Sequence, residues 1–146
     1  MAVTLANADH LAEVAMLFDQ YRVFYGRSSN LGDAKQFLAE RFRTQDSTIF
    51  LALDQGDSVG FTQLYPSFSS VSMRRIWILN DLFVLASHRR QGIAKQLMQV
   101  AADYAQKTGA VRLALATQKI NTAAQSLYQS LGYQQDQDLS HFVLTL

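Results

Sequence analysis

The stretch VLASHRRQGIAKQLM, residues 84–98, joins an apolar run to an amphipathic helix through a short basic loop. The first backbone N–H groups of a helix have no partner inside the helix and lie at the positive end of its dipole. Phosphate groups bind at such helix ends. Gly92 has no Cβ to hold a phosphate off the main chain, and Arg89, Arg90 and Lys95 add positive charge. The stretch therefore indicates an anion site, although an ordinary helix start with a solvated basic face has the same pattern.

Composition limits the classes of protein to consider. The chain has 146 residues, 49% of them hydrophobic, with a net charge of +1 and no cysteine. These values predict a single domain over residues 1–146, without the broad positive field that binds nucleic acid or an anionic membrane. His10, His88 and His141 are scattered without metal-ligand spacing, so no metal is expected. No leader or membrane-spanning stretch is evident at the sequence level, which predicts a cytoplasmic protein.

Hydrophobic periodicity predicts strands alternating with helices. Asp9 is expected to cap the first helix, and Pro66 with the serines after it to end the third strand in a loop. The expected order is β-α-α-β-β-β-α-β-α-β(-β), with strands at Val3–Leu5, 47–53, 58–65, Arg74–Leu85, 111–117 and 141–146, and helices at 9–25, Asp33–Arg43, 92–107 and Asn121–Leu131.

The loop sequence limits the class of ligand to consider. It reads Arg-x-x-Gly-x-Ala, and neither Gly-x-Gly-x-x-Gly nor Gly-Lys-Ser/Thr is present, so dinucleotide and triphosphate sites are disfavoured. Together, NDLFVLASHRRQGIAKQLM (80–98) and NTAAQSLYQSLGY (121–133) resemble the GCN5-related N-acetyltransferase (GNAT) superfamily. The likeness is strong over residues 74–133, and elsewhere it rests on the order of elements alone.

The resemblance implies an α/β fold with a mixed, mostly antiparallel central sheet flanked by helices, and acetyl coenzyme A as acetyl donor. It places the pantetheine arm along the fourth strand, with an amide near Val84 polarising the thioester carbonyl, and the pyrophosphate on main-chain amides at the start of the following helix. The donor-binding residues that it implies are Leu82, Phe83, Val84, Arg89, Arg90, Gln91, Gly92, Ile93, Ala94, Lys95, Asn121 and Ala124.

The same resemblance implies that Tyr128 is the general acid that protonates the leaving thiolate, whereas helical periodicity alone favours a core residue. Asn121 either contacts the pantetheine arm or caps its helix. Relatives that acetylate polyamines often have a glutamate where this chain has Asn80, and an amide cannot accept a proton. Asp81 could help through water or could simply hydrogen-bond a loop or helix end. A distant carboxylate or bulk solvent could take the proton instead, so the general base stays open.

A primary amine is the implied acceptor, and a small molecule similar to a diamine, polyamine or lysine analogue is favoured. Asn80, Asp81, Tyr21 and Tyr25 are the candidate acceptor residues, with Tyr65, Phe68 and Trp77 as further aromatics that could hold an organic cation. A protein lysine or N-terminal amine and a non-catalytic acyl-coenzyme A sensor remain open as alternatives, and a homodimer is expected. A nucleic-acid module built on Arg74, Arg75, Arg89 and Arg90 is disfavoured by the net charge.

Overall fold

The computed structural model describes residues 1–146, and the chain forms two compact units, Met1–Ala116 and Thr117–Leu146. The expectation of a single domain stays a prediction, and each unit is described by itself. The larger unit contains strands β1 (Ala2–Leu5), β2 (Thr48–Asp54), β3 (Asp57–Ser69), β4 (Arg74–Val84) and β5 (Leu113–Leu115), helices α1 (Leu11–Phe24), α2 (Leu31–Thr44) and α3 (Ile93–Lys107), and 3₁₀ turns at Ala8–His10 and Ala86–His88. The smaller unit contains helix α4 (Thr122–Ser130).

The five strands form one sheet in chain order, β1-β2-β3-β4-β5. The first three pairings are antiparallel and only β5 runs parallel to its neighbour β4. The predicted class, an α/β fold with a mixed, mostly antiparallel sheet flanked by helices, is therefore confirmed.

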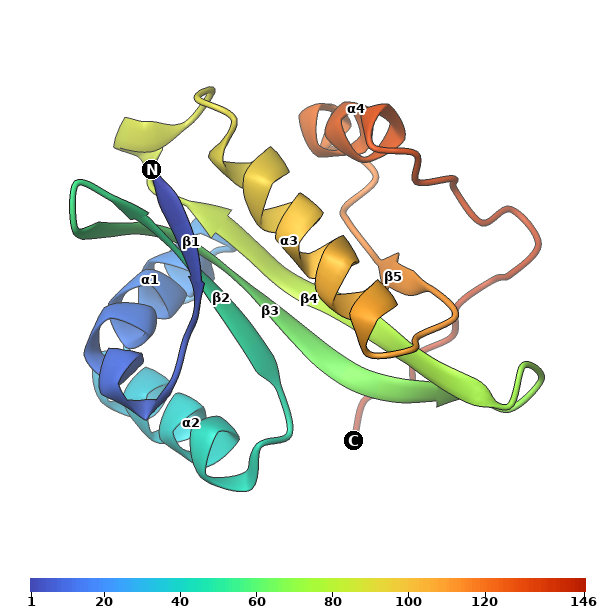
Figure 1. Ribbon diagram of the computed structural model, residues 1–146, viewed down its shortest axis with the longest axis horizontal. Helices are drawn as coiled ribbons and strands as arrows, with labels where there is room; N and C mark the ends of the chain where they lie inside the picture. Colours follow the sequence, from blue (N-terminus) through green and yellow to red (C-terminus); the bar gives the residue numbers. More distant parts are fainter. The chain divides into compact units, whose positions relative to one another are not determined.

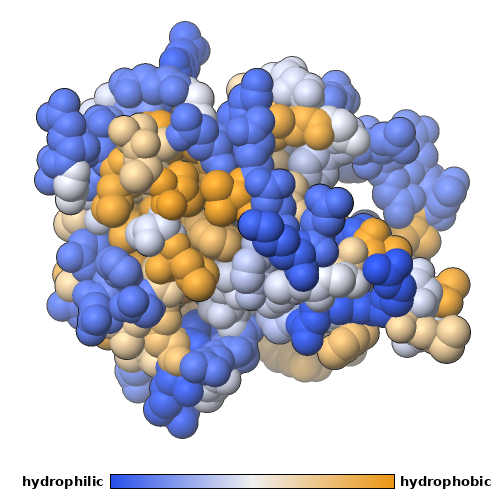
Figure 2. Space-filling model, viewed as in Figure 1, coloured by the Kyte–Doolittle hydropathy of each residue, from blue (hydrophilic) through white to orange (hydrophobic).

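Helices cover both faces of the sheet in the larger unit, with α1 and α2 on one face and α3 on the other (Figure 1). Under α1 and α2 lies a core cluster of Ala6, Val14, Ala15, Leu17, Leu38, Ile49, Leu51, Phe61 and Phe83. The apolar stripe of α3 buries Ile93, Leu97, Met98, Ala101 and Ala105. Around β1, beside α3, the surface is apolar in the space-filling view, and Leu5 of β1 is 54% exposed (Figure 2).

Strand β3 is longer than predicted, because it continues through Pro66 to Ser69. Proline has no N–H to donate and is tolerated only where no strand needs that donor. The pairing of β2 with β3 begins at Thr48 and Leu64, so beyond Leu64 only β4 lies beside β3. Pro66 pairs with Trp77 of β4 and leaves no β2 acceptor unmatched.

Two further expectations are wrong. Asn7, and not Asp9, caps the first helical segment: its side chain accepts a hydrogen bond of 2.9 Å from the Asp9 amide. The last expected strand, 141–146, has no regular structure, and Phe142, Val143 and Leu144 are almost fully exposed. Strand-forming residues become a strand only when another backbone pairs with theirs, and this segment has no such partner.

Candidate active site

Strands β4 and β5 separate after a short pairing. β5 pairs only with Trp77, Ile78 and Leu79, whereas β4 continues to Val84. Residues 80–84 therefore have β3 on one side and no strand on the other. An extended ligand can pair with such an open edge through main-chain hydrogen bonds, as an added strand does.

A β-bulge lies where this open edge begins. The register of β3 with β4 passes from Gln63 opposite Asp81 to Leu64 opposite Leu79, so Asn80 is the extra residue. Asn80 is exposed and Asp81 is only 4% exposed. Asn80 and Asp81 therefore have different environments, as expected. The cause is the bulge and not the simple alternation of side chains along a strand.

The loop after β4 presents the start of α3. Gly92 has φ +80° and Arg90 has φ +61°, both in the left-handed region. The first hydrogen bond of the helix runs from the Gln96 amide to the Gly92 oxygen at 3.0 Å. The amides of residues 93–95 come before this bond and lie at the positive end of the helix dipole. This geometry favours the binding of an anion. A Cβ at Gly92 would meet no atom within 4 Å, so its conformation and not crowding calls for glycine.

Two side chains hold this loop in place. His88 Nε2 lies 3.4 Å from Asp54 Oδ2 at the end of β2, and Ser87 Oγ lies 2.7 Å from His88 Nδ1. The side chain of Arg89 is held by two contacts. Its Nε donates a 3.0 Å hydrogen bond to the Val84 oxygen, and its guanidinium lies over the ring of Phe24 at 5.0 Å. Arg90 and Lys95 are exposed, and their part in donor binding stays a prediction.

An aromatic cluster lies on the opposite side of β4 from α3. The Tyr21 ring contacts Tyr25 at 5.0 Å, Phe61 at 5.9 Å and Phe83 at 6.2 Å between centroids. Tyr21 is half-buried and Tyr25 is exposed. The two tyrosines predicted for the acceptor thus lie together, in a setting where a ring face can contact a cation.

Asp81 is the buried acid of this cluster. Gln63 Nε2 donates to its Oδ2 at 2.7 Å and Asn80 Nδ2 donates to its Oδ1 at 3.1 Å. The Tyr21 hydroxyl is a further hydrogen-bond partner of the carboxylate. Burial raises the pKa of Asp81 above the ordinary range, because a charged carboxylate loses solvation there, and the three hydrogen bonds offset only part of this rise. A carboxylate with a raised pKa is a better proton acceptor.

The neighbouring tyrosines stay neutral at ordinary pH. Burial, with the negative charge of Asp81 as the next cause, raises the pKa of Tyr65 to about 12. The same two effects raise the pKa of Tyr21 further. Asp81 is therefore the group of this set that ionises first as pH rises, before either tyrosine.

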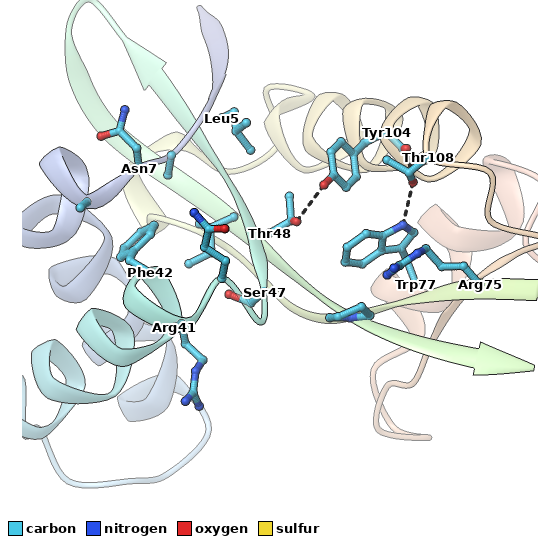
Figure 3. Close-up of a pocket in the computed structure, with 15 residues that line it drawn as sticks. Leu5, Asn7, Arg41, Phe42, Ser47, Thr48, Arg75, Trp77, Tyr104 and Thr108 are labelled. Carbon is cyan, nitrogen blue, oxygen red and sulfur yellow. Dashed lines mark hydrogen bonds between the residues drawn. The ribbon is translucent and has the colours of Figure 1, made fainter.

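Two predicted acceptor aromatics lie elsewhere. Trp77 faces α3, where its Nε1 donates to Thr108 Oγ1 at 2.9 Å. It lines a hollow of about 850 Å³ near the end of β1 and the start of β2, where Thr48 Oγ1 donates to the Tyr104 hydroxyl at 3.1 Å (Figure 3). Apart from Trp77, none of the candidate donor or acceptor residues lines this hollow. Phe68 is 70% exposed beneath Arg75, so neither ring joins Tyr21.

The smaller unit contains the remaining candidates. Asn121 caps α4, its Oδ1 accepting a 3.1 Å hydrogen bond from the Ala124 amide, so the capping role is confirmed. The ring of Tyr128 lies 6.1 Å from that of Tyr133, and the main-chain oxygen of Tyr128 accepts a 3.0 Å hydrogen bond from the Tyr133 amide.

Gln63 is a polar residue that the sequence analysis missed. It is fully buried, between strand neighbours whose side chains are also buried. A glutamine inside the buried run GFTQLY (60–65) is itself a signal, because a buried amide needs partners and therefore points to another polar group nearby.

Comparison with known proteins identifies the class. The sequence model of the acetyltransferase (GNAT) family matches residues 14–133. The uncharacterized N-acetyltransferase YhfO of Bacillus subtilis is 44% identical over 146 residues, covering 100% of this chain and 98% of the relative. The crystal structure of a probable acetyltransferase superposes with a TM-score of 0.95 at 42% identity, covering 100% of this chain and 98% of the other. Aminoglycoside N(6')-acetyltransferase type 1 of Salmonella enteritidis is 25% identical, covering 92% of each chain.

The open strand edge, the left-handed glycine at the start of α3 and these matches define an acetyl-coenzyme A-dependent N-acetyltransferase. The chain belongs to the GNAT acetyltransferase family. None of its helices combines the length and the apolar character needed to cross a bilayer. No three His, Asp or Glu side chains are grouped closely enough to hold a metal ion.

Proposed function

We propose that the protein transfers the acetyl group of acetyl coenzyme A directly to the primary amine of a small molecule, with Asp81 as the carboxylate that receives the amine. The observation that carries this proposal is the buried Asp81 beside Tyr21 at the point where β4 loses its outer partner. The aromatic cluster of Tyr21 and Tyr25 supports a cationic acceptor, because ring faces attract organic cations.

Asp81 has two tasks in this proposal. A primary amine with a pKa of about 10.4 is mostly protonated at neutral pH and cannot attack a thioester. Asp81 first attracts the ammonium group and then takes one proton, so that an N–H bond breaks and an O–H bond forms. Asn80 cannot take the proton, but its amide hydrogen bond of 3.1 Å helps to hold the carboxylate.

The donor is assigned to the open edge and the loop. Leu82, Phe83 and Val84 offer main-chain groups to the pantetheine arm, and the Val84 amide polarises the thioester carbonyl. The amides of residues 90–95, with the charges of Arg90 and Lys95, receive the pyrophosphate. When bound, the donor supplies an activated acetyl group on sulfur.

Tyr128 is assigned the last proton transfer. As the C–N bond forms and the C–S bond breaks, Tyr128 gives its phenolic proton to the leaving sulfur, whose thiol titrates near 8.5 by analogy with cysteine, and the proton that the new amide nitrogen loses restores the phenol. Asn121 and Ala124, at the start of the same helix, are assigned to the pantetheine side of the site. The motif NTAAQSLYQSLGY supports these assignments.

The acceptor class is a small cationic amine of the diamine, polyamine or lysine-analogue type. The relative named aminoglycoside N(6')-acetyltransferase, whose name gives a small-molecule acceptor, supports a small molecule over a protein amine. The family match and the names of the relatives favour catalysis over an acyl-coenzyme A sensor. A homodimer and a cytoplasmic location remain predictions.

The test is a thiol-release assay with acetyl coenzyme A against diamines, polyamines, lysine analogues, aminoglycosides and acetyl-accepting peptides. Asp81→Asn and Tyr128→Phe are assayed in parallel, with donor affinity measured by calorimetry. We expect turnover with one small-amine class, lowered at least about 100-fold in each variant because general acid-base groups contribute that much. Donor binding should survive in Asp81→Asn. Turnover restricted to peptides would contradict the small-molecule assignment.

A further inference from the structure

We infer that Gln63 is a positioning residue for Asp81, and that its side-chain amide holds the carboxyl group in both of its protonation states. The inference rests on the proposed role of Asp81 as the proton acceptor. It adds a residue on a different strand, Gln63 of β3, whose side chain is fully buried.

The geometry places the two side chains in a buried pair. Gln63 and Asp81 are opposite each other in the β3–β4 register, so their side chains project on the same face of the sheet. Gln63 is 0% exposed and Asp81 is 4% exposed. The 2.7 Å bond from Gln63 Nε2 to Asp81 Oδ2 is therefore shielded from water, which strengthens it.

The other end of the amide has no partner. Gln63 Oε1 is buried and accepts no hydrogen bond within the chain. A buried acceptor without a partner costs free energy, and native structures contain few of them. The unpaired Gln63 Oε1 therefore needs a physical explanation. A change in the protonation state of Asp81 provides one.

An amide suits an acid that gains and loses a proton. A carboxylate only accepts hydrogen bonds, whereas a carboxylic acid also donates one. Gln63 donates through Nε2 to the charged form, as seen here. When Asp81 takes a proton on Oδ2, a half-turn of the Gln63 amide brings Oε1 to that oxygen and the unused acceptor receives the new O–H. One side chain thus matches both states without movement of the strands.

The other groups around Asp81 cannot substitute for Gln63. The titratable groups facing it are Tyr21 from α1 and Tyr65 from β3, and both stay protonated because burial raises their pKa values. Arg41 and Asp46, a 2.8 Å ion pair at the end of α2, act on Tyr65. Asn80 donates from an exposed position, where water competes with its bond.

The experiment compares Gln63→Met, which keeps the length of the side chain and removes both polar atoms, with Thr62→Val as the matched control. Thr62 is the adjacent β3 residue, fully buried, and its Oγ1 donates a 2.8 Å bond to the Asp81 main-chain oxygen. Thr62→Val therefore removes a buried hydrogen bond to the same residue without touching its carboxyl group. Gln63→Glu, nearly identical in shape, is a second variant in case the methionine variant does not fold.

Two readouts are measured on the full chain: the pH profile of kcat/KM, and the titration of the Asp81 carboxyl carbon by ¹³C NMR, assigned with Asp81→Asn. Loss of the Nε2 donor should move the Asp81 titration and the acid limb of the profile to higher pH by about one unit. Activity below that limb then falls about tenfold, because one pKa unit corresponds to a factor of ten. Gln63→Glu should move both in the same direction, since a second acid disfavours ionisation of the first.

The outcomes separate the two claims. If Asp81→Asn retains full activity, the proposed role of Asp81 is wrong, and the NMR titration alone then decides whether Gln63 controls this carboxyl group. If Asp81→Asn is inactive but both Gln63 variants titrate like the wild type, Gln63 is only a packing residue and the inference is overturned. A shift of equal size in Thr62→Val would also overturn it, since any buried hydrogen bond would then have the same effect.

Discussion

The Nε of Arg89 donates a 3.0 Å hydrogen bond to the main-chain oxygen of Val84, five residues earlier in the chain. This bond closes the loop between the end of β4 and the start of α3 on itself. The guanidinium also lies over Phe24 of α1 at 5.0 Å and over Phe83 of β4 at 5.7 Å. Arg89 thus links the loop assigned to the donor with the helix that carries Tyr21.

This link predicts unequal roles for the two adjacent arginines. Arg89→Lys keeps the charge but loses the planar group that stacks on both rings, so the loop is less well preorganised for binding. We expect the KM for acetyl coenzyme A to rise about 3- to 10-fold, as for a loss of about 1 kcal/mol. Arg90→Lys is the control and should change this KM less than twofold. Equal effects of the two substitutions would mean that charge alone matters at Arg89.

Replacement of Gly92 should destabilise the protein because of the backbone conformation of this residue. Gly92→Ala places a Cβ on a residue with φ +80°, which costs about 1 kcal/mol although the Cβ would meet no neighbour. We expect a lower melting temperature and a higher KM for acetyl coenzyme A. Gly32→Ala, within α2, is the matched control: its φ is not positive and alanine favours helix, so this variant should be about 0.5–1 kcal/mol more stable. Thermal unfolding of both variants checks the contrast.

Asp19 should stabilise the protein only above acidic pH. Its carboxylate accepts hydrogen bonds from Ser29 Oγ at 2.6 Å and the Asn30 amide at 2.7 Å, and these bonds lower its pKa. A lowered pKa in the folded state gives stability that is present above the unfolded value of about 3.9 and is lost as pH falls through the folded value. Asp19→Asn should therefore unfold at a lower temperature than the wild type near neutral pH, and the gap should narrow below about pH 4.

The control for Asp19 is Asp103→Asn on the exposed side of α3. It removes the same formal charge without removing a loop contact. Thermal unfolding of both variants across acidic and neutral pH separates the effect of net charge from that of the two hydrogen bonds. A gap for Asp19→Asn that stays constant across this range would contradict the assignment.

Asp81 should show the opposite pH dependence. Its pKa is raised, so the folded protein retains the proton at pH values where the unfolded chain has lost it. Stability is therefore unaffected below the unfolded pKa of about 3.9 and falls as pH rises through the folded value. Asp81→Asn has no charge to bury, so its unfolding free energy relative to wild type should increase from about pH 4 to neutral pH. Denaturant unfolding measures this difference, and a decrease with pH would show that Asp81 is stabilised as a carboxylate.

Hydrophobic periodicity and short motifs predicted most helices and strands correctly. The apolar positions of α1 and α3 follow helical spacing, and Val14, Ala15, Leu97 and Ala101 are buried as that spacing requires. The left-handed Gly92 lies at the predicted helix start. Asn121 caps its helix. These features depend on contacts between residues close together in the chain, so a single sequence contains enough information to predict them.

Apart from the helix cap at Asn7, the errors share another cause. Pro66 was expected to end β3, but the absence of β2 beyond Leu64 lets the strand continue. The segment 141–146 has strand-forming residues and yet no strand partner. Trp77 was grouped with Tyr21 as an acceptor aromatic, but the face of the sheet on which it lies turns it toward α3. In each case the deciding contact is made with residues distant in sequence, and local propensity does not encode it.

Short motifs and periodicity were enough to predict the family and the order of the elements as far as α4. Which acid is buried, and what holds it, depends instead on how the strands pair and pack. The bulge at Asn80 leaves that side chain exposed and sets Asp81 opposite Gln63, two residues 18 positions apart in the chain. Burial then raises the pKa of Asp81, because solvation of a charge depends on every group packed around it and not on its neighbours in sequence.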